Sequence, residues 1–450
     1  MNCNCAICKN NQSFEMPDGI VNAAIEGNLV LFCGAGISTE NNMVMPYSFY
    51  SEIMNELELD DNTLSFSSLM QKYCDQPNGR RKLIKKIKGR FDYIHSFPEL
   101  EFQATRFHKE LSQIYPIKTI VTTNWDTYFE DYCDAIPITS PEDFSLYDSD
   151  KRHVLKIHGS INNLSSIVAT TADYNHCYER LTNGVLGATL KTYLATKTVV
   201  FIGFSFGDDD FNQLMQYISK EMGDFYPHFY IVTLDDTLQK QIEYKNSTCI
   251  VTAGTFFLHK LRLALIEKGS IRDCSKIIDY IGCMKRIVQT THINTSSIDK
   301  EVFPCVLYTL VYQDGVLHAF DRFLEGNKNG EYCDPDFIMS SIHGYEDLIL
   351  RVHTRKDYLN EAYYEGYLNG LVLIGCCKGD DDIEEIIKSF PILYLPGRKA
   401  PKTVKTYHKY LQKLSTSDNE YSKHAQEAIS RLIDNNCDDH KNIVIHHPPF

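Results

Sequence analysis

The sequence predicts an α/β fold with a Rossmann-like parallel sheet for roughly the first 265 residues. Short β-rich runs alternate there with helical stretches, and each run ends in Gly, Thr, His or Asp. Beyond about residue 270 the alternation stops and helical patterns dominate. Ligands of open α/β sheets bind at the carboxyl ends of the strands, so the residues after each run are the candidate site.

The predicted strands are 29–33, 119–122, 154–157, 198–203, 229–233 and 249–252. Residues 54–115 lack strand signals and predict a helical insertion that caps the sheet, ended by Pro116. A further helix is predicted over 211–222, after three aspartates that can cap it, Asp208, Asp209 and Asp210.

We expect two domains, 1–268 and 269–450. The second is predicted to be a mainly helical α+β domain. Its stretches "DYLNEAYYEGYLNGLVLIG" and "VKTYHKYLQKL" have helical periodicity, and extended pieces are expected around 306–312 and 392–395.

Composition narrows the class of protein. The chain has 450 residues, of which 43% are hydrophobic, and a formal net charge of −14. An acidic balance argues against a protein that coats nucleic acid, so nucleic acid is not expected as a direct ligand. The sequence shows no membrane span and no apolar signal-peptide core, and its 15 cysteines lack a secreted framework. These features predict a cytoplasmic protein with reduced cysteines.

The stretch "LFCGAGIS" places Gly34 and Gly36 directly after the first predicted strand. Glycines there let backbone N–H groups approach a diphosphate near a helix start. The third glycine of the dinucleotide fingerprint is replaced by Thr39. Taken alone, the stretch fits a phosphate-binding loop or a tight turn equally well.

Three later stretches also carry polar residues at strand ends: "IVTTNWD", "LKIHGS" and "VFIGFSFGDDDF". In their order and strand context, the four motifs resemble those of the sirtuin family, and more closely its bacterial branch of NAD-cleaving antiviral defence proteins. The resemblance covers roughly residues 15–266. It implies that residues 1–268 form a sirtuin-like NAD-binding catalytic domain.

The resemblance implies cleavage of the nicotinamide–ribose bond of NAD, which passes through an oxocarbenium-like state. Asn124 would orient a water or a ribose hydroxyl, and His158 would accept a proton, the two side chains meeting beside the glycine turn. The implied cofactor-binding residues are Gly34, Ala35, Gly36, Ser38, Thr39, Thr123, Asp126, Gly203, Ser205 and Asp235. Of these, Asp126 would hold the nicotinamide amide or steady the loop.

Three departures separate this chain from sirtuin deacetylases. The four-cysteine zinc ribbon is missing, since only Cys177 lies between His158 and Thr198. The cofactor-loop arginine is missing from Pro46-Tyr47-Ser48-Phe49, and Thr123 stands where the family has glutamine. These departures favour hydrolysis of NAD by water, without a metal, and leave Phe49 or Tyr50 to cover the nicotinamide pocket.

The expected function is an NAD⁺ glycohydrolase that acts as an effector of anti-phage abortive infection. Residues 269–450 would then be a regulatory or oligomerisation domain. A homo-oligomer is expected, and a HerA-type ATPase or another defence protein is a candidate partner. Two alternatives stay open: an NAD-dependent deacylase or ADP-ribosyltransferase, and a non-catalytic sensor of NAD or an ADP-ribose-type nucleotide.

Two further stretches have competing interpretations. Cys3, Cys5 and Cys8 have ligand-like spacing but no evident fourth ligand, so a structural zinc is the less favoured interpretation. The basic stretch "RRKLIKKIKGR", residues 80–90, has apolar residues at helical spacing. It predicts an amphipathic helix with a solvated basic face, the alternative being a surface for a nucleotide or nucleic acid.

Overall fold

The computed structural model describes residues 13–60, 63–204, 216, 220, 223, 228–234, 247–326, 328–377, 383–401 and 403–434. The chain divides into two compact units, Met1–Ile271 with Lys328–Gly330, and Arg272–Asn327 with Glu331–Phe450. Each unit buries its own set of apolar side chains.

One parallel sheet of seven strands forms the centre of the first unit, in the order β3-β4-β2-β1-β5-β6-β7. This confirms the predicted α/β fold with a Rossmann-like parallel sheet. The strand bounds are β1 Leu29–Cys33, β2 Thr119–Thr122, β3 Ile136–Ile138, β4 His153–Lys156, β5 Thr198–Ile202, β6 Phe229–Thr233 and β7 Ser247–Val251.

The predicted strands agree closely with the observed ones. Strands β1, β2 and β6 have the predicted bounds, and the other three predicted strands are displaced by one or two residues. Strand β3 is the one observed strand that the sequence did not predict. It has only three residues and contains Pro137. Proline cannot donate to a ladder and is tolerated at the edge of a sheet, which is where β3 lies.

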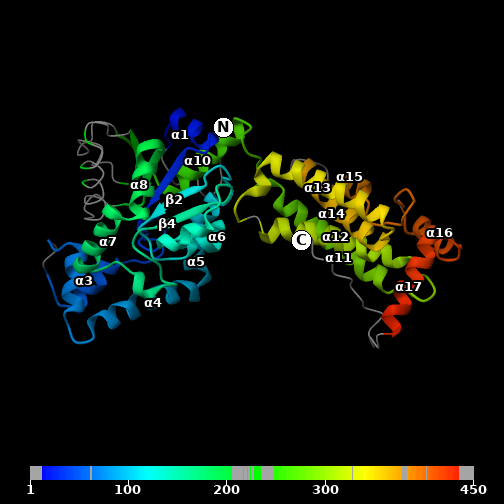
Figure 1. Cartoon of the computed structure of the whole chain (residues 1–450), viewed down its shortest axis with the longest axis horizontal. Coiled ribbons are helices and arrows are strands. Elements are labelled where there is room, and N and C mark those ends of the chain that lie inside the picture. Colours follow the sequence, from blue (N-terminus) through cyan, green and yellow to red (C-terminus); the bar gives the residue numbers. More distant parts are fainter. Residues whose placement is uncertain are drawn as a thin grey trace. The chain divides into compact units, whose positions relative to one another are not determined.

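Helices cover both faces of the sheet (Figure 1). On one face lie α7 (Thr171–Asn183) and α8 (Val185–Thr196), whose leucines share a core with the strand residues Val30 and Phe32. On the other face lie α5 (Pro98–Leu111), α6 (Tyr128–Cys133) and α10 (Gly254–Glu267), with α1 (Asp18–Ile25) packed on α10. Burial on both faces explains why the strands are continuous apolar runs.

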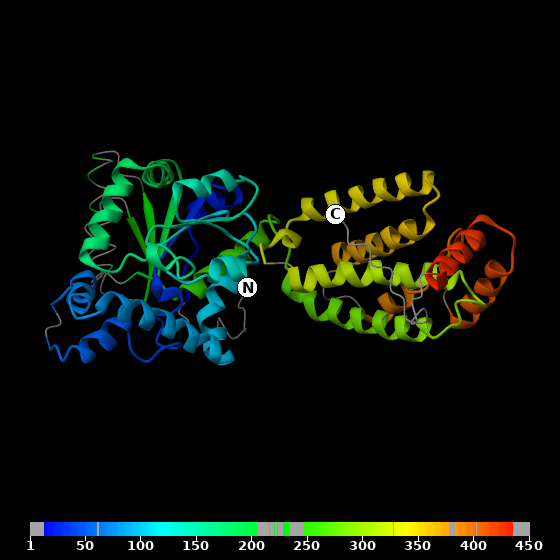
Figure 2. The same ribbon diagram turned by 60° about the horizontal axis from the view of Figure 1, so that its bottom comes forward.

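The predicted helical insertion contains the end of α2 (Phe49–Glu56), then α3 (Phe66–Cys74), α4 (Gly79–Ser96) and α5. Helices α2, α3 and α4 share an apolar core, which includes Ile53, Leu69 and Leu83 and is completed by Ile167 and Ala169. Figure 2 shows these helices, in blue, along one side of the first unit. Helix α5 packs against α6 and α10 as well as against α4, so it joins the insertion to the layer that covers the sheet.

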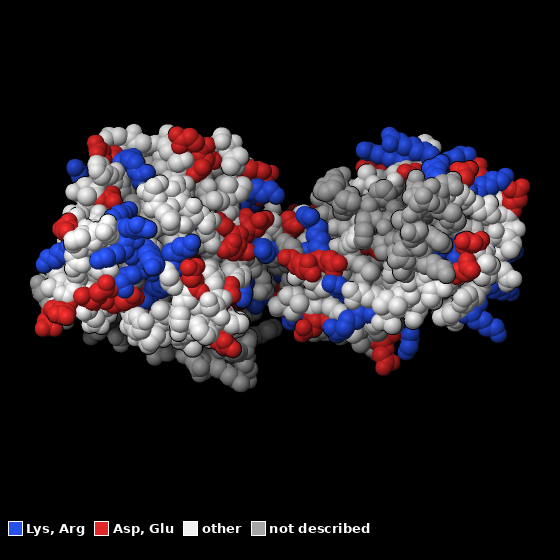
Figure 3. Space-filling model, turned by 90° about the horizontal axis from the view of Figure 1, so that it is seen from below, with Lys and Arg blue, Asp and Glu red and all other residues white. Residues whose placement is uncertain are grey.

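The basic stretch 80–90 lies on α4 and forms the predicted amphipathic helix. Leu83 and Ile87 are buried, whereas Arg81, Lys82, Lys85 and Lys88 are exposed. Blue side chains gather on the face of the first unit that carries α4 (Figure 3). One basic residue, Arg90, differs from the predicted solvated face because its side chain is only 6% exposed.

All regular elements in the described part of the second unit are helices. The predicted helices over 357–375 and 404–414 are found as α14 and α16. The main helices are α11 (Ile278–Ser296), α12 (Val306–Gly326), α13 (Pro335–Thr354), α14 (Tyr358–Cys376), α15 (Ile383–Ser389), α16 (Val404–Ser415) and α17 (Glu420–Asp434).

The expectation of extended structure in the second unit is wrong at 306–312, which forms the first two turns of α12. Valine, leucine and tyrosine gave this segment a strand-like composition, but tertiary packing overrides so weak a preference. Helix α12 packs closely along α14, where Gly366 lies so near Tyr312 that a β-carbon would be 1.9 Å from its carbonyl oxygen. Residues 392–395 form neither helix nor strand.

No helix in the described part of the chain is both long and apolar enough to cross a membrane. The same residues contain no group of three or more His, Cys, Asp or Glu side chains that could hold a metal ion. Several predictions fall outside the described residues: the cysteines Cys3, Cys5 and Cys8, the capping aspartates Asp208, Asp209 and Asp210, and most of the predicted helix 211–222.

Candidate active site

Four neighbouring strands bring the four sequence motifs to one edge of the sheet. Strands β4, β2, β1 and β5 are consecutive in the sheet and parallel, so their carboxyl ends lie side by side. His158 follows β4, Asn124 follows β2, Gly34 follows β1 and Gly203 follows β5. Adjacent strands are about 4.8 Å apart. The motifs therefore lie within reach of one small ligand.

The glycine turn packs directly on the end of β5. The N–H of Gly34 donates to Ile202 O and that of Gly36 to Gly203 O, both at 2.9 Å. A β-carbon on Gly34 or Gly36 would lie 2.6 or 2.9 Å from Gly203 O, and Gly203 itself has φ +78°. Close approach of two backbone segments thus requires these glycines. Binding of a diphosphate by the turn stays a prediction.

Asn124 lies inside this group of strand ends and is 5% exposed. Its Nδ2 donates to Gly34 O at 3.2 Å and to Ser38 Oγ at 3.4 Å. Its backbone N–H donates to Thr122 Oγ1, which in turn donates to Cys33 O. The amide oxygen Oδ1 is buried and has no hydrogen-bond partner among the described residues. An unpaired buried acceptor is costly unless a water or ligand hydroxyl satisfies it.

Asp126 connects the glycine turn to the start of α6 through hydrogen bonds. Its Oδ2 accepts from Ser38 Oγ at 3.0 Å, and its Oδ1 accepts from the N–H of Tyr128 at the start of α6. Burial raises the pKa of this carboxyl, and the nearby Lys156 ammonium opposes that rise. Lys156 donates to Asp126 O and pairs with Glu130 at 3.0 Å. Asp126 therefore steadies the loop through contacts within the protein.

His158 is 3% exposed and lies after β4, the neighbour of the strand that precedes Asn124. Its ring meets Tyr174 edge to face, with 5.0 Å between centroids. Burial, assisted by the Arg180 charge, lowers the pKa of His158 to about 3, so the imidazole is neutral at pH 7. The next residue, Gly159, has φ +80° and no room for a side chain beside Ser166. A contact between the Asn124 and His158 side chains stays a prediction.

The other predicted residues lie at the same edge or outside the described part. Ala35 is partly exposed in the glycine turn, and Thr39 is buried just after it. The N–H of Thr123 donates to Cys33 O at 3.3 Å, which joins the ends of β2 and β1. Ser205 and Asp235 lie outside the described residues, so their predicted contacts with the nucleotide are untested.

Two phenylalanine rings pack against Trp125, the residue that follows Asn124. The Trp125 ring lies 6.5 Å from that of Phe49 and 6.3 Å from that of Phe66, centroid to centroid. Trp125 Nε1 is buried without a hydrogen-bond partner in the described part of the chain. Tyr50, by contrast, donates to Leu64 O and so is held against the insertion. Of the two residues proposed to cover the nicotinamide pocket, Phe49 is the one that faces Trp125.

Sequence reasoning missed three residues that organise this edge: Trp125, Lys156 and Arg90. Trp125 lies within the "TTNWD" motif, so its position beside Asn124 was a usable signal. Lys156 follows an apolar run and is wholly buried, which residue type alone would not suggest. Arg90 is one of several basic residues on α4 and carries no distinguishing sequence signal.

Most of the strand-end motifs fall within a match to a known domain family. The sequence model of the SIR2-like domain matches residues 118–251, from β2 to β7. The chain carries a SIR2-like domain. The resemblance to the sirtuin family is thereby confirmed for this part of the first unit, and the strand-end residues Asn124, His158 and Gly203 lie within the matched range.

The curated proteins to which this chain is similar include NAD(+) hydrolases and a defence-associated sirtuin. NAD(+) hydrolase ThsA of Cytobacillus dafuensis is 32% identical over 207 residues, 44% of this chain and 39% of the relative. NAD(+) hydrolase ThsA of Enterococcus faecium is 29% identical over 309 residues, 62% of this chain and 60% of the relative. Defense-associated sirtuin 2 of Bacillus subtilis is 25% identical over 252 residues, 52% of this chain and 24% of the relative. The chain thus spans less than two thirds of these relatives.

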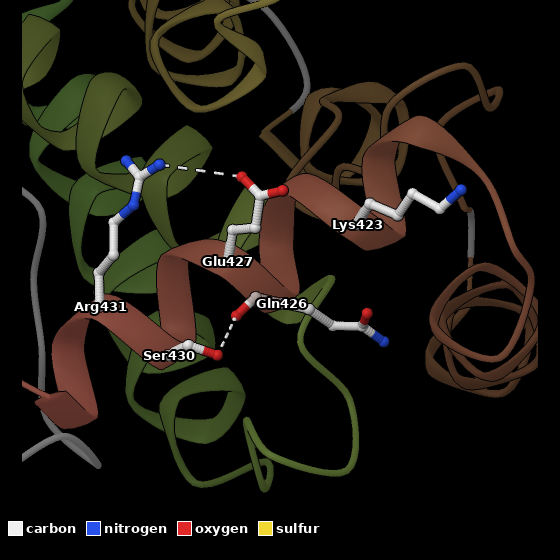
Figure 4. A pocket seen from close by; sticks show the side chains of 5 residues that line it. All are labelled: Lys423, Gln426, Glu427, Ser430 and Arg431. Atoms are coloured by element: carbon white, nitrogen blue, oxygen red, sulfur yellow. Dashed lines mark hydrogen bonds and ion pairs between the residues drawn. The ribbon is translucent and has the colours of Figure 1, made fainter.

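A pocket in the second unit does not resemble a ligand site. It is lined by Lys423, Gln426, Glu427, Ser430 and Arg431, all from one face of α17 (Figure 4). Arg431 pairs with Glu427 at 3.8 Å, and Ser430 Oγ donates to Gln426 O at 3.0 Å. These exposed side chains interact along their own helix and converge on no common point. The strand-end edge of the SIR2-like domain remains the candidate active site.

Proposed function

We propose that this protein is an NAD⁺ glycohydrolase, cleaving NAD⁺ and water to nicotinamide, ADP-ribose and a proton. The observation that carries the proposal is the buried amide oxygen of Asn124, which lacks a partner at the edge where four motif-bearing strands end. A water or ribose hydroxyl at this position would satisfy it. The names of the relatives, NAD(+) hydrolase ThsA among them, support the same substrate.

The proposed reaction requires only a few side chains of the protein. The C–N bond to nicotinamide breaks with development of an oxocarbenium-like ribose, and water adds to the same carbon. Asn124 Oδ1 would accept a hydrogen bond from that water or from a ribose hydroxyl, while its Nδ2 is held by Gly34 O and Ser38 Oγ. The amide is thus fixed in orientation before the substrate binds.

His158 is proposed as the proton acceptor. Its low pKa keeps the imidazole neutral, which is the form able to accept a proton. A low pKa also makes it a weak base. A water molecule that adds to an oxocarbenium becomes strongly acidic, so a weak base placed within reach is sufficient.

Water is proposed as the acceptor instead of an acylated lysine. A deacetylase of this family would carry a zinc ribbon after the His-Gly motif, but the segment contains Cys177 alone. Cys177 lies on α7, and its thiol is buried in the core and donates to Ile157 O at 3.2 Å. It is therefore a packing residue and no part of a ribbon.

We further propose that the protein acts in the cytoplasm as an effector of anti-phage defence; the name of one relative, Defense-associated sirtuin 2, supports a role in defence. The helical second unit would then control the activity, through self-association or a partner such as a HerA-type ATPase. An enzyme that drains NAD⁺ must be held inactive in a healthy cell, and the second unit is available for that role.

The test is NAD⁺ turnover by the purified full chain, with nicotinamide and ADP-ribose quantified over time. Asn124→Ala should lower turnover by about 100-fold or more, and His158→Ala should lower it strongly, with folding intact by circular dichroism. Asn22→Ala, an exposed amide on α1, is the matched control and should retain wild-type turnover. Wild-type turnover in Asn124→Ala would refute the mechanism.

The alternatives predict different products. A deacylase or ADP-ribosyltransferase would release nicotinamide only when a protein acceptor is added. A nucleotide sensor would bind NAD⁺ saturably and return it intact after long incubation. Nicotinamide and ADP-ribose in equal amounts, without any acceptor, would distinguish the hydrolase from both.

A further inference from the structure

The loop between the glycine turn and α2, residues 39–48, borders the candidate active site. It follows Ser38, which contacts both Asn124 and Asp126, and it ends at Phe49, which faces Trp125. The middle of the loop is pinned by Val44 and Met45, which pack in a small core with Ile94, Ala104 and Tyr128. Nothing in its own sequence supplies a cation, because the arginine of the related loop is missing here.

Arg90 supplies a guanidinium to this loop from helix α4. Its Nη2 donates to Glu40 Oε1 and to Tyr47 O, both at 3.0 Å, and lies 3.5 Å from Thr39 O. Glu40 Oε2 in turn accepts from the N–H of Phe49 at 3.2 Å. One ion pair therefore connects the beginning of the loop to its end.

The position of the Arg90 guanidinium is strongly constrained. Its side chain is 6% exposed, and its Cζ lies 5.8 Å from the Tyr47 ring centroid and 6.0 Å from that of Phe49. Arg90 lies on helix α4, which has 18 residues and a buried apolar face, and this helix places the guanidinium against the loop. A planar group held by three oxygens and two rings allows the loop little freedom.

The surrounding charges argue against a direct contact of Arg90 with a diphosphate. Its Nη1 lies 3.6 Å from Glu52 Oε2, and Lys86 pairs with Glu52 at 3.0 Å and with Glu56 at 2.7 Å. With Glu40, this cluster has three carboxylates and two cations. An excess of negative charge does not attract phosphate, so the arrangement serves to hold the loop.

We propose that Arg90 is a positioning residue of the candidate active site. Through Glu40 and the carbonyl of Tyr47 it holds the 39–48 loop, and with it Phe49, in place beside Trp125 and Asn124, and so determines how tightly NAD⁺ binds. The effect on NAD⁺ rests on the proposed function, whereas the effect on the loop does not.

Trp125 provides a test that needs no activity, because it is the single tryptophan of the chain. In Arg90→Met the loop loses its anchor, and acrylamide quenching of Trp125 fluorescence should increase as Phe49 moves away. Arg90→Lys keeps the charge but lacks the planar guanidinium that lies over the Tyr47 and Phe49 rings, so it should be intermediate. Arg81→Met removes an exposed arginine from the same helix and should match the wild type.

Steady-state kinetics then separate positioning from a purely structural role. Arg90→Met should raise KM for NAD⁺ by about 10-fold or more, with a smaller change in kcat, and Arg90→Lys should recover part of that loss. Glu40→Gln should show the same pattern, because it weakens the same ion pair. Thermal unfolding of each variant verifies that the protein is folded under the assay conditions.

Two results would overturn the proposal. One is an Arg90→Met protein with wild-type Trp125 quenching. The other is an active Arg90→Met protein in which only Tm falls while KM and kcat stay unchanged. If the wild-type chain cleaves no NAD⁺, the proposed function fails and Trp125 quenching alone decides whether Arg90 holds the loop.

Discussion

The hydroxyl of Ser38 donates a hydrogen bond to Asp126 Oδ2 at 3.0 Å, across 88 residues of sequence. The two residues follow neighbouring strands, β1 and β2, and both are buried. Asn124 Nδ2 lies 3.4 Å from the same hydroxyl. A single hydroxyl thus joins the glycine turn to the residue proposed to orient the substrate.

Removing this hydroxyl should lower the stability of the protein and change the titration of Asp126. Ser38→Ala leaves a buried Asp126 oxygen without its donor, which should lower the free energy of unfolding by about 1–3 kcal/mol. The loss of that hydrogen bond should also raise the pKa of Asp126 further. Urea unfolding measures the first effect. Ser51→Ala, an exposed serine on α2, serves as control, and an equal loss in both variants would contradict the interpretation.

A methyl group on Gly203 should be poorly tolerated. Its φ of +78° and the 2.7 Å approach of Ile37 Cγ2 to the added carbon predict a combined cost of about 2–4 kcal/mol in Gly203→Ala. Gly27→Ala separates the two causes, because Gly27 has φ +67° but nothing within 4 Å. It should cost only about 1 kcal/mol. Equal losses in urea unfolding would show that close packing contributes nothing.

Acid should destabilise the first unit through buried histidines. Burial lowers the pKa of His108 and of His158 to about 3, against 6.5 in the unfolded chain. Between these values the unfolded state binds more protons, so the free energy of unfolding falls as pH falls. The slope is up to about 1.4 kcal/mol per pH unit for each histidine. Two carboxyls whose pKa is raised by desolvation, those of Asp126 and Glu130, partly offset this loss.

The variant His108→Phe tests the sign of this effect. Its site is lined by the rings of Phe107, Tyr128 and Phe129, so phenylalanine should fit. Urea unfolding between pH 4.5 and about 7.5 should give a shallower dependence on pH than in the wild type, by up to about 1.4 kcal/mol per unit. His176→Phe changes an exposed histidine and should leave the slope unchanged. An unchanged slope in His108→Phe would refute the prediction.

Glycines should matter at the contact between α12 and α14 in the second unit. In Gly366→Ala the new carbon would lie 1.9 Å from Tyr312 O, so the helices must separate and the unit should lose several kcal/mol of stability. Gly344→Ala, on α13 with nothing within 4 Å, should instead stabilise by about 1 kcal/mol through helix propensity. Calorimetry of the full chain measures both, and a loss of stability in Gly344→Ala would argue against this explanation.

The strands show how much of the fold the pattern of apolar residues predicts. Strands β1, β2 and β6 were predicted with their observed bounds because a strand buried on both faces must be a continuous apolar run. The segment 306–312 has a similar composition and is helical. Composition cannot separate a buried strand from a buried helix. The difference lies in partners, since this segment packs on α14 far along the chain.

The sequence by itself determined the parallel sheet and the strand-end positions of Asn124, His158 and the glycine turn, because these follow from local apolar runs and the residues directly after them. Only the tertiary structure decided that Gly34 and Gly36 pack on Gly203, that Lys156 is buried beside Asp126, and that Arg90 reaches the 39–48 loop. Those relations depend on which segments meet in space, and no local pattern encodes a contact between residues 30 or more positions apart.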